Sequence, residues 1–227
     1  MTAFQCKIVV KKKPSGLNWT RSEQLYNYGA LGSIGMSTLF HFLKEKLDVQ
    51  IPTFFNLLLM ILILAWLSSF FLRLNEHKNF NAAYIGDFHI EEHHFHCAGR
   101  EFPFTSLRNL KTDIRDFYGK KTGNRRIGPH YSNGIDNFIA FDSGGESFTF
   151  QLEFLSERVI DDFNWALINC ICSERIPYQR SNFNCIPEEL LDMPTVRNFI
   201  AKLLKEQRID ASDSLVIRGY YIDETTN

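Results

Sequence analysis

Residues 51–72, IPTFFNLLLMILILAWLSSFFL, decide how the rest of the chain is organised. None of these residues is charged, and only Asn56, Ser68 and Ser69 interrupt the apolar run. At about 1.5 Å of rise per residue, a helix of this length crosses a hydrocarbon core of about 30 Å. The alternative is a helix buried in a soluble core, but such a helix usually keeps a polar stripe. We therefore predict a transmembrane helix here.

The preceding stretch, residues 24–43, also lacks Asp, Glu, Lys and Arg, but it contains glycines and hydroxyl side chains. Gly29, Ser33 and Ser37 recur at four-residue spacing, which makes a face of small residues that a partner helix can approach closely. This pattern predicts a second membrane helix that packs through those three residues. The alternative is an amphipathic helix that lies on the membrane surface.

Thr20 and Glu23 have the spacing of a capping box, which predicts that the first helix begins at this point. The connection between the two apolar stretches, KEKLDVQ, is too short for a domain. Residues 24–73 are therefore expected to form a two-helix transmembrane anchor, a helical hairpin with both ends on one side.

Flanking charge predicts which side that is. The basic residues are Lys7, Lys11, Lys12, Lys13 and Arg21 before the hairpin, Lys44 and Lys46 in its connection, and Arg73 and Lys78 after it. Because cytoplasmic flanks carry the excess of Lys and Arg, we expect a multi-pass protein of the inner (cytoplasmic) membrane. Its N-terminal segment, residues 1–23, and its C-terminal domain would both be cytoplasmic. Five scattered cysteines agree with a reducing compartment.

After Lys78, short runs of aromatic and β-branched residues alternate with turn signals, which is typical of antiparallel strands. FHIEEHHFHC, residues 88–97, predicts a hairpin whose turn spans 91–94. IDNFIAFD and ESFTFQLEF predict a second hairpin around Ser143, Gly144 and Gly145.

A helix is expected next, because Ser156 is a candidate N-cap and apolar residues recur at three- and four-residue spacing up to Cys170. Beyond Pro177, PTVRNFIAKLLKEQ predicts a helix with Pro194 in its first turn, and DSLVIRGYYID predicts a final strand. This extension, residues 177–227, is expected either to pack on the preceding domain or to form a partner-binding appendage.

This order of elements, with FPFTSL between strands and FTFQLEFLSERVIDDFNWALINCI at the end, resembles the bacterial membrane-anchored pleckstrin-homology-like (PH-like) proteins. The resemblance implies that residues 80–176 form a small cytoplasmic PH-like antiparallel β-barrel or sheet capped by a C-terminal helix. The expected class is thus α+β, with the transmembrane hairpin before that domain and an extra α/β tail after it. The family supplies few agreed functional residues, so none is transferred.

The run from His89 to Cys97 contains imidazole, carboxylate and thiol groups, which are ligands of zinc. His94 and His96 are the residues of a possible metal site, but the hairpin turn would leave the histidines solvated, and a polar turn is the alternative. Cys170 and Cys172 do not form a C-x-x-C motif. The common nucleotide-binding and hydrolase motifs are absent, so we expect no enzyme and no cofactor.

The loop GKKTGNRRIGPHYSNG carries Lys120, Lys121, Arg125 and Arg126, in a domain that starts only a few residues after the predicted membrane helix. Basic side chains near an anionic leaflet contribute about 1 kcal/mol each to membrane binding. The loop is therefore a candidate site for a lipid headgroup or a small anionic ligand, and an ordinary solvated loop is the alternative.

The leading hypothesis is a membrane-tethered, non-enzymatic binding module for a protein, a lipid headgroup or a small anionic ligand. The runner-up is a ligand-sensing membrane effector whose hairpin forms homo-oligomers and disturbs the bilayer. A metal-dependent enzyme is the third class. The net charge of -1 predicts no nucleic-acid partner.

Overall fold

The computed structural model describes residues 3–14, 16–48, 50, 52–123 and 128–217. The chain divides into two compact units. The sheet unit comprises Met1–Val10, Ala83–Phe117 and Gly134–Asn227, and the helix-pair unit comprises Lys11–Ala82 and Tyr118–Asn133. Each is described by itself.

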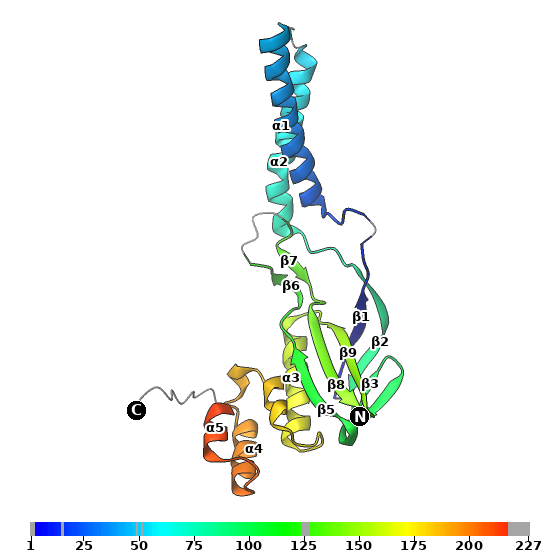
Figure 1. Cartoon of the computed structure of the whole chain (residues 1–227), viewed down its shortest axis with the longest axis vertical. Helices are drawn as coiled ribbons and strands as arrows, with labels where there is room; N and C mark the ends of the chain where they lie inside the picture. Colours follow the sequence, from blue (N-terminus) through cyan, green and yellow to red (C-terminus); the bar gives the residue numbers. More distant parts are fainter. Residues whose placement is uncertain (1–2, 15, 49, 51, 124–127, 218–227) are drawn as a thin grey trace, which may run out of the picture. The chain divides into compact units, whose positions relative to one another are not determined.

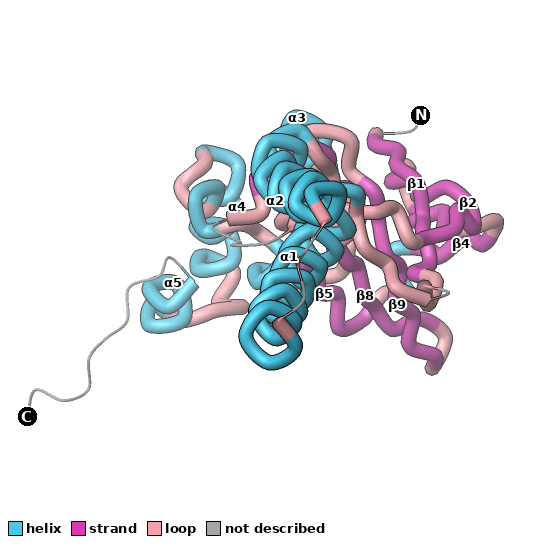
Figure 2. Tube along the Cα trace, turned by 90° about the horizontal axis from the view of Figure 1, so that it is seen from above, coloured by secondary structure: helices cyan, strands magenta, loops and turns pink. Residues whose placement is uncertain are grey.

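The sheet unit is built on a seven-stranded sheet with the strand order β4-β3-β2-β1-β9-β8-β5. The strands are β1 (Phe4–Lys11), β2 (Ala82–Ile90), β3 (His94–Cys97), β4 (Arg100–Pro103), β5 (Arg108–Asp113), β8 (Asn137–Ser143) and β9 (Glu146–Glu153). Figure 2 shows the strands in magenta and labels β1, β2, β4, β5, β8 and β9. The registered pairs are antiparallel, and the predicted α+β class is confirmed.

The first strand, β1, was not expected, because residues 1–23 were assigned to a segment outside the β domain. In the structure Phe4, Cys6 and Ile8 are buried, whereas the alternating Gln5 and Lys7 are exposed. β1 lies between β2 and β9 in the sheet. A boundary at residue 80 therefore omits a strand from the middle of the sheet.

Both predicted hairpins are confirmed. β2 and β3 pair with Phe88 opposite Cys97, and the expected turn connects them. β8 and β9 pair over their whole length, and Gly144 and Gly145 connect them with φ angles of 62° and 86°. A side chain is strained in that left-handed region, so two glycines suit this turn.

The predicted helix after β9 is α3 (Glu157–Cys172), and it closes the core of the sheet unit (Figures 1 and 2). Phe163 of α3 packs edge-on against Phe4 of β1 and Phe154 after β9, with ring centroids 5.3 and 5.6 Å apart. Phe88 of β2 lies against the same ring. β1 is thus part of the core as well as of the sheet.

The C-terminal extension contains two 3-10 helices, η3 (Arg180–Cys185) and η4 (Glu188–Leu190), and the α-helices α4 (Pro194–Lys205) and α5 (Ala211–Ile217). The predicted α4 is confirmed, with Pro194 in its first turn. Val196, Phe199, Ile200 and Leu203 are buried in the same hydrophobic core as the sheet. Of the two alternatives for the extension, packing on the preceding domain is therefore the one observed.

The predicted final strand is wrong where the structure describes it, because Ala211–Ile217 is the helix α5. Asp210 accounts for this local choice, since its Oδ1 accepts hydrogen bonds from the backbone of Asp213 at 2.6 Å and the hydroxyl of Ser212 at 2.8 Å. Such a side chain satisfies an amide at the start of a helix. The remainder of the predicted strand lies outside the described residues.

The helix-pair unit contains α1 (Arg21–Leu47) and α2 (Thr53–Leu72), which run antiparallel and side by side (Figure 1). Ring contacts join Tyr26 to Phe70 and Phe40 to Phe55. The predicted capping box of α1 is present in full. Ile51, the first residue of the predicted membrane span, lies outside the described residues.

The two helices differ in how apolar they are. Within the described residues one helical segment, Thr53–Asn75, is long and apolar enough to cross a membrane, and α1 does not meet that criterion. Ser69 is the one buried residue of α2. α2 is therefore largely exposed and is not part of the buried core of the described residues, while the predicted membrane crossing and the multi-pass topology stay predictions.

Candidate functional site

The basic loop between β5 and β8 forms a two-stranded ribbon of β6 (Tyr118–Lys121) and β7 (Tyr131–Asn133). The predicted ligand residues Lys120 and Lys121 lie in β6. Arg125 and Arg126, the other two, lie outside the described residues.

Aromatic stacking joins this ribbon to the segment that follows α2. The ring of His77 stacks on Tyr118, with centroids 4.4 Å apart and planes 8° apart, and on Tyr131 at 5.3 Å and 30°. The amide of Lys78 donates to the carbonyl of Tyr131 at 2.8 Å. The imidazole thus lies in contact with two phenol rings, one from each strand of the ribbon.

Arg73 and His130 form a second contact between the same segments. The amide of His130 donates to the carbonyl of Arg73 at 3.2 Å, and Nε of Arg73 donates to Nε2 of His130 at 3.2 Å. The second bond requires a lone pair on Nε2, which assigns the proton of the neutral ring to Nδ1. Arg73 also lies over the ring of Phe70, 6.0 Å from its centroid.

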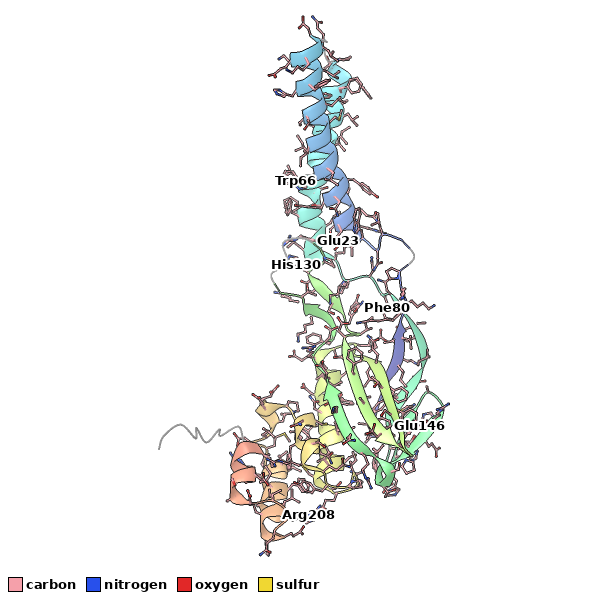
Figure 3. All side chains as sticks on the ribbon, in the orientation of Figure 1. Glu23, Trp66, Phe80, His130, Glu146 and Arg208 are labelled. Atoms are coloured by element: carbon pink, nitrogen blue, oxygen red, sulfur yellow. The ribbon has the colours of Figure 1, made fainter. Side chains whose placement is uncertain are left out.

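Two carboxylates accept hydrogen bonds at the start of α1, and they connect it to the segment after α2 and to the ribbon. Glu23 accepts from the amide of Thr20 at 2.8 Å, and Glu76 accepts from the amide and hydroxyl of Ser22. Gly128, with φ of 100°, lies so close to Glu23 that an added Cβ would meet Oε1 at 2.9 Å. Figure 3 labels Glu23 and His130 at this end of the helix pair. We call the described parts of residues 11–23, 73–82 and 118–133 the collar.

The collar is the basic end of the helix-pair unit. Its described cationic residues are Lys11, Lys12, Lys13, Arg21, Arg73, Lys78, Lys120 and Lys121. Glu23 and Glu76 are its carboxylates, and both accept hydrogen bonds from the start of α1. At the other end of the pair, Lys44 and Lys46 are accompanied by Glu45 and Asp48. The collar therefore carries the chemistry to attract an anionic group by charge.

The predicted packing face of α1 is used within the chain. Gly29 is buried, and a Cβ there would lie 2.6 Å from the backbone nitrogen of Trp66 in α2. Ser33 is half-buried and its hydroxyl donates to the carbonyl of Gly29 at 2.6 Å, whereas Ser37 is exposed. One of the three predicted residues thus makes the close helix contact, and α2 is the partner.

The histidine cluster does not form a metal site among the described residues. His94 lies 3.4 Å from a carboxylate oxygen of Glu91, and the ring of His96 packs against that of His89 with centroids 5.4 Å apart. The part of the chain that the structure describes contains no group of three or more His, Cys, Asp or Glu side chains able to hold a metal ion. The possible site at His94 and His96 therefore lacks further ligands there.

The cysteines are all free thiols, and burial raises the pKa of each. The pKa of Cys97 rises to about 12, and those of Cys170, Cys172 and Cys185 rise to about 11. A reactive cysteine needs a lowered pKa, so these thiols are structural in character.

Sequence reasoning did not find the contacts that build the collar. His77 lies far along the chain from Tyr118 and Tyr131, and no local pattern indicates that they stack. Comparisons with protein-family models, curated proteins and solved structures found no match for this chain. The functional argument therefore rests on the residues themselves.

Proposed function

We propose that this protein is a membrane-tethered binding module with α1 and α2 as its two-helix anchor. Its β domain works at the cytoplasmic face of the inner membrane, and its collar binds the anionic headgroup of a lipid. This role requires no catalytic group.

The observation that carries the proposal is the place of the helix pair in the chain. β1 precedes α1 and β2 follows α2, yet the two strands are neighbours in one sheet. The chain must therefore leave and return on the same side of any membrane that α2 crosses. A second crossing is then needed between β1 and β2, and α1 is the other helix available. Its uncharged residues 24–43 are long enough at about 1.5 Å per residue.

The surface of the helix pair supports lipid as its surroundings. The exposed large apolar residues of α2 are Phe54, Phe55, Leu57, Leu58, Met60, Ile61, Ile63, Leu64, Leu67, Phe70, Phe71 and Leu72. In α1 they are Tyr28, Leu31, Ile34, Leu39, Phe42 and Leu47. Soluble monomers rarely expose so large a continuous apolar patch. The small polar groups of α1 that would be costly in lipid, such as Ser33 and Thr38, bond to carbonyls of their own helix.

Charge supports the orientation. The collar carries the larger share of Lys and Arg, and the positive-inside rule places that end in the cytoplasm. Each cation near an anionic leaflet contributes about 1 kcal/mol of attraction, so several of them together favour anionic over zwitterionic lipid.

The PH-like resemblance remains part of the proposal. An antiparallel sheet whose last strand is followed by a core-closing helix agrees with the domain that the resemblance implies. The chain departs from the expected order in one respect, because its helix pair follows the first strand and does not precede the domain.

The effector hypothesis is not favoured by a specific observation. It was motivated by the small-residue face at Gly29, Ser33 and Ser37, and the close contact at Gly29 is made with α2 of the same chain.

Reporter fusions test the topology. Alkaline phosphatase is active outside the cytoplasm, so we expect activity when it replaces the chain after Asp48 and none when it is fused to the C-terminus. A fluorescent protein at the C-terminus should be fluorescent. Phosphatase activity at the C-terminus would contradict the proposed orientation.

Lipid retention tests the collar. The full chain is extracted in mild detergent with equal amounts of phosphatidylglycerol and phosphatidylcholine, and bound lipid is counted by native mass spectrometry. We expect Lys78→Gln, Lys120→Gln and Lys121→Gln together to reduce retained phosphatidylglycerol. The matched control, Lys44→Gln with Lys46→Gln at the opposite end, should leave it unchanged. Equal loss in both variants would reject the collar as the binding site.

A further inference from the structure

A second candidate site lies within the sheet unit, in a cavity of about 280 Å³. Its walls come from β1, β2, β9 and the start of α3, and they include Lys7, Asp87, Glu153, Leu155 and Val159. Cavities that enclose drug-sized ligands measure about 300–1,000 Å³, so this one suits a small ligand or a single side chain.

Charges in the cavity do not cancel. Nζ of Lys7 lies 2.6 Å from a carboxylate oxygen of Asp87, and this bond lowers the pKa of Asp87. These two residues therefore neutralise each other. Glu153 stands opposite Lys7 in the sheet register, but it forms no ion pair with any residue that the structure describes. One carboxylate is left without a cation.

That carboxylate belongs to a residue that the protein largely covers. Glu153 is 8% exposed, and Oε1 accepts one hydrogen bond from the hydroxyl of Tyr84 at 3.0 Å. A buried carboxylate normally has a cationic partner, because the cost of desolvating an unpaired charge amounts to several kcal/mol. A carboxylate that lines a cavity without a cationic partner can accept one from a ligand.

The wall beside Glu153 is apolar. Leu155 is 65% exposed at the mouth of the cavity, and Val159 lines it from the first turn of α3. A ligand that matches the cavity needs a positive head for Glu153 and an aliphatic stem for these two side chains. Both features belong to an alkylammonium group.

We propose that this cavity binds an alkylammonium group, with its head on Glu153 and its stem on Leu155 and Val159. Two sources present this chemistry: a free small amine, and a lysine side chain of a partner protein. The ammonium neutralises Glu153 and donates hydrogen bonds to it, and the Lys7–Asp87 pair stays intact.

The experiment uses the full chain in mild detergent and ligand-observed saturation-transfer NMR. The probes are 1,4-diaminobutane for the free amine, N-acetyl-lysine amide for the side chain, and 1-butanol as a neutral analogue. We expect saturation transfer to at least one amine and none to 1-butanol. Tighter binding of diaminobutane assigns a free amine, and tighter binding of the lysine derivative assigns a protein side chain.

Two variants with a matched control locate the binding. Glu153→Gln keeps the shape of the side chain and removes its charge, and we expect it to weaken amine binding at least about tenfold. Leu155→Lys at the exposed mouth supplies a competing ammonium and should weaken binding even if Glu153→Gln does not fold. Glu146→Gln, an exposed acid at the other end of β9 (Figure 3), should leave binding unchanged. No amine binding, or binding unaffected by both cavity variants, would overturn the proposal.

Discussion

The helices α2 and α3 place their apolar residues in opposite ways. In α2 one residue of 20 is buried, Ser69, and the phenylalanines and most of the leucines are exposed. In α3 the apolar residues Phe163, Leu167, Ile168 and Ile171 are buried, and charged residues face outward. Burial of apolar area stabilises α3 within the fold. Among the described residues, α2 buries little apolar area apart from its contact with α1.

Truncation of a leucine in each helix gives the largest predicted difference. Leu167 is 0% exposed, and Leu167→Ala should lower the free energy of unfolding by about 2–5 kcal/mol through lost burial and a new cavity. Leu64 of α2 is 55% exposed, and Leu64→Ala should change it by about 0.5 kcal/mol or less. Denaturant unfolding of the detergent-solubilised chain measures both. Equal losses would show that the two helices are buried alike.

A second prediction concerns the contact between α1 and α2. Gly29→Leu places atoms where the backbone of Trp66 lies, and overpacking of this kind costs about 1–3 kcal/mol. Gly35, on the same helix, has nothing within 4 Å of an added Cβ, so Gly35→Leu is the matched control. Helicity followed by circular dichroism during SDS titration should fall earlier for Gly29→Leu alone. Identical titrations would argue against the close approach.

A third prediction compares how the two regions begin their helices. Thr20 caps α1 through its side chain, whereas Ser156 before α3 makes no side-chain cap hydrogen bond. Thr20→Ala should cost about 1 kcal/mol, and Ser156→Ala clearly less. Chemical denaturation monitored by circular dichroism distinguishes them. A larger loss for Ser156→Ala would reverse this ranking.

The smallest predicted effect is on pH dependence, and it is confined to the sheet unit because all five cysteines lie there. Burial raises the pKa of Cys97 to about 12 from an ordinary value of 9.0. Above pH 9 the thiol ionises in the unfolded chain but not in the folded one, so stability is lost as pH rises from 9 toward 12.

At pH 9 the loss due to one such thiol is less than about 1 kcal/mol. Cys97→Ala should therefore show a shallower fall in unfolding free energy between pH 8 and pH 10 than the parent chain. Parallel pH profiles for the two proteins would contradict the raised pKa.

Local patterns predicted the parts of the fold that local chemistry determines. The Thr20–Glu23 capping box, the Gly144–Gly145 turn and the Pro194 helix start each depend on residues a few positions apart, and each is present. Asp210 supplies the same kind of local cap for α5, and the strand predicted from DSLVIRGYYID did not include it.

Long-range pairing accounts for what was missed. FQCKIVVK alternates apolar and polar residues as a strand does, but its partner in β9 lies at the other end of the domain sequence, with Ile8 opposite Leu152. The local sequence does not distinguish Glu153 from other strand residues. Its surroundings come from Lys7, Tyr84 and Asp87, which are distant from it in the sequence. Lys120 and Lys121 were named as candidate ligand residues because their charge is visible in the sequence. The stacking of His77 on Tyr118 and Tyr131 has no such signal.

The position of β1 also sets an order of events during synthesis. β1 is synthesised before its partner strand, and Leu152, which pairs with Ile8, is made roughly 7 to 30 s later at about 5–20 residues per second. In the proposed topology both helices enter the bilayer during that interval. The sheet can then be completed only on molecules whose second helix has returned the chain to the starting side. In a chain with a single crossing, β1 and its partner strands would lie on opposite sides of the bilayer. Only correctly inserted chains would then complete the core.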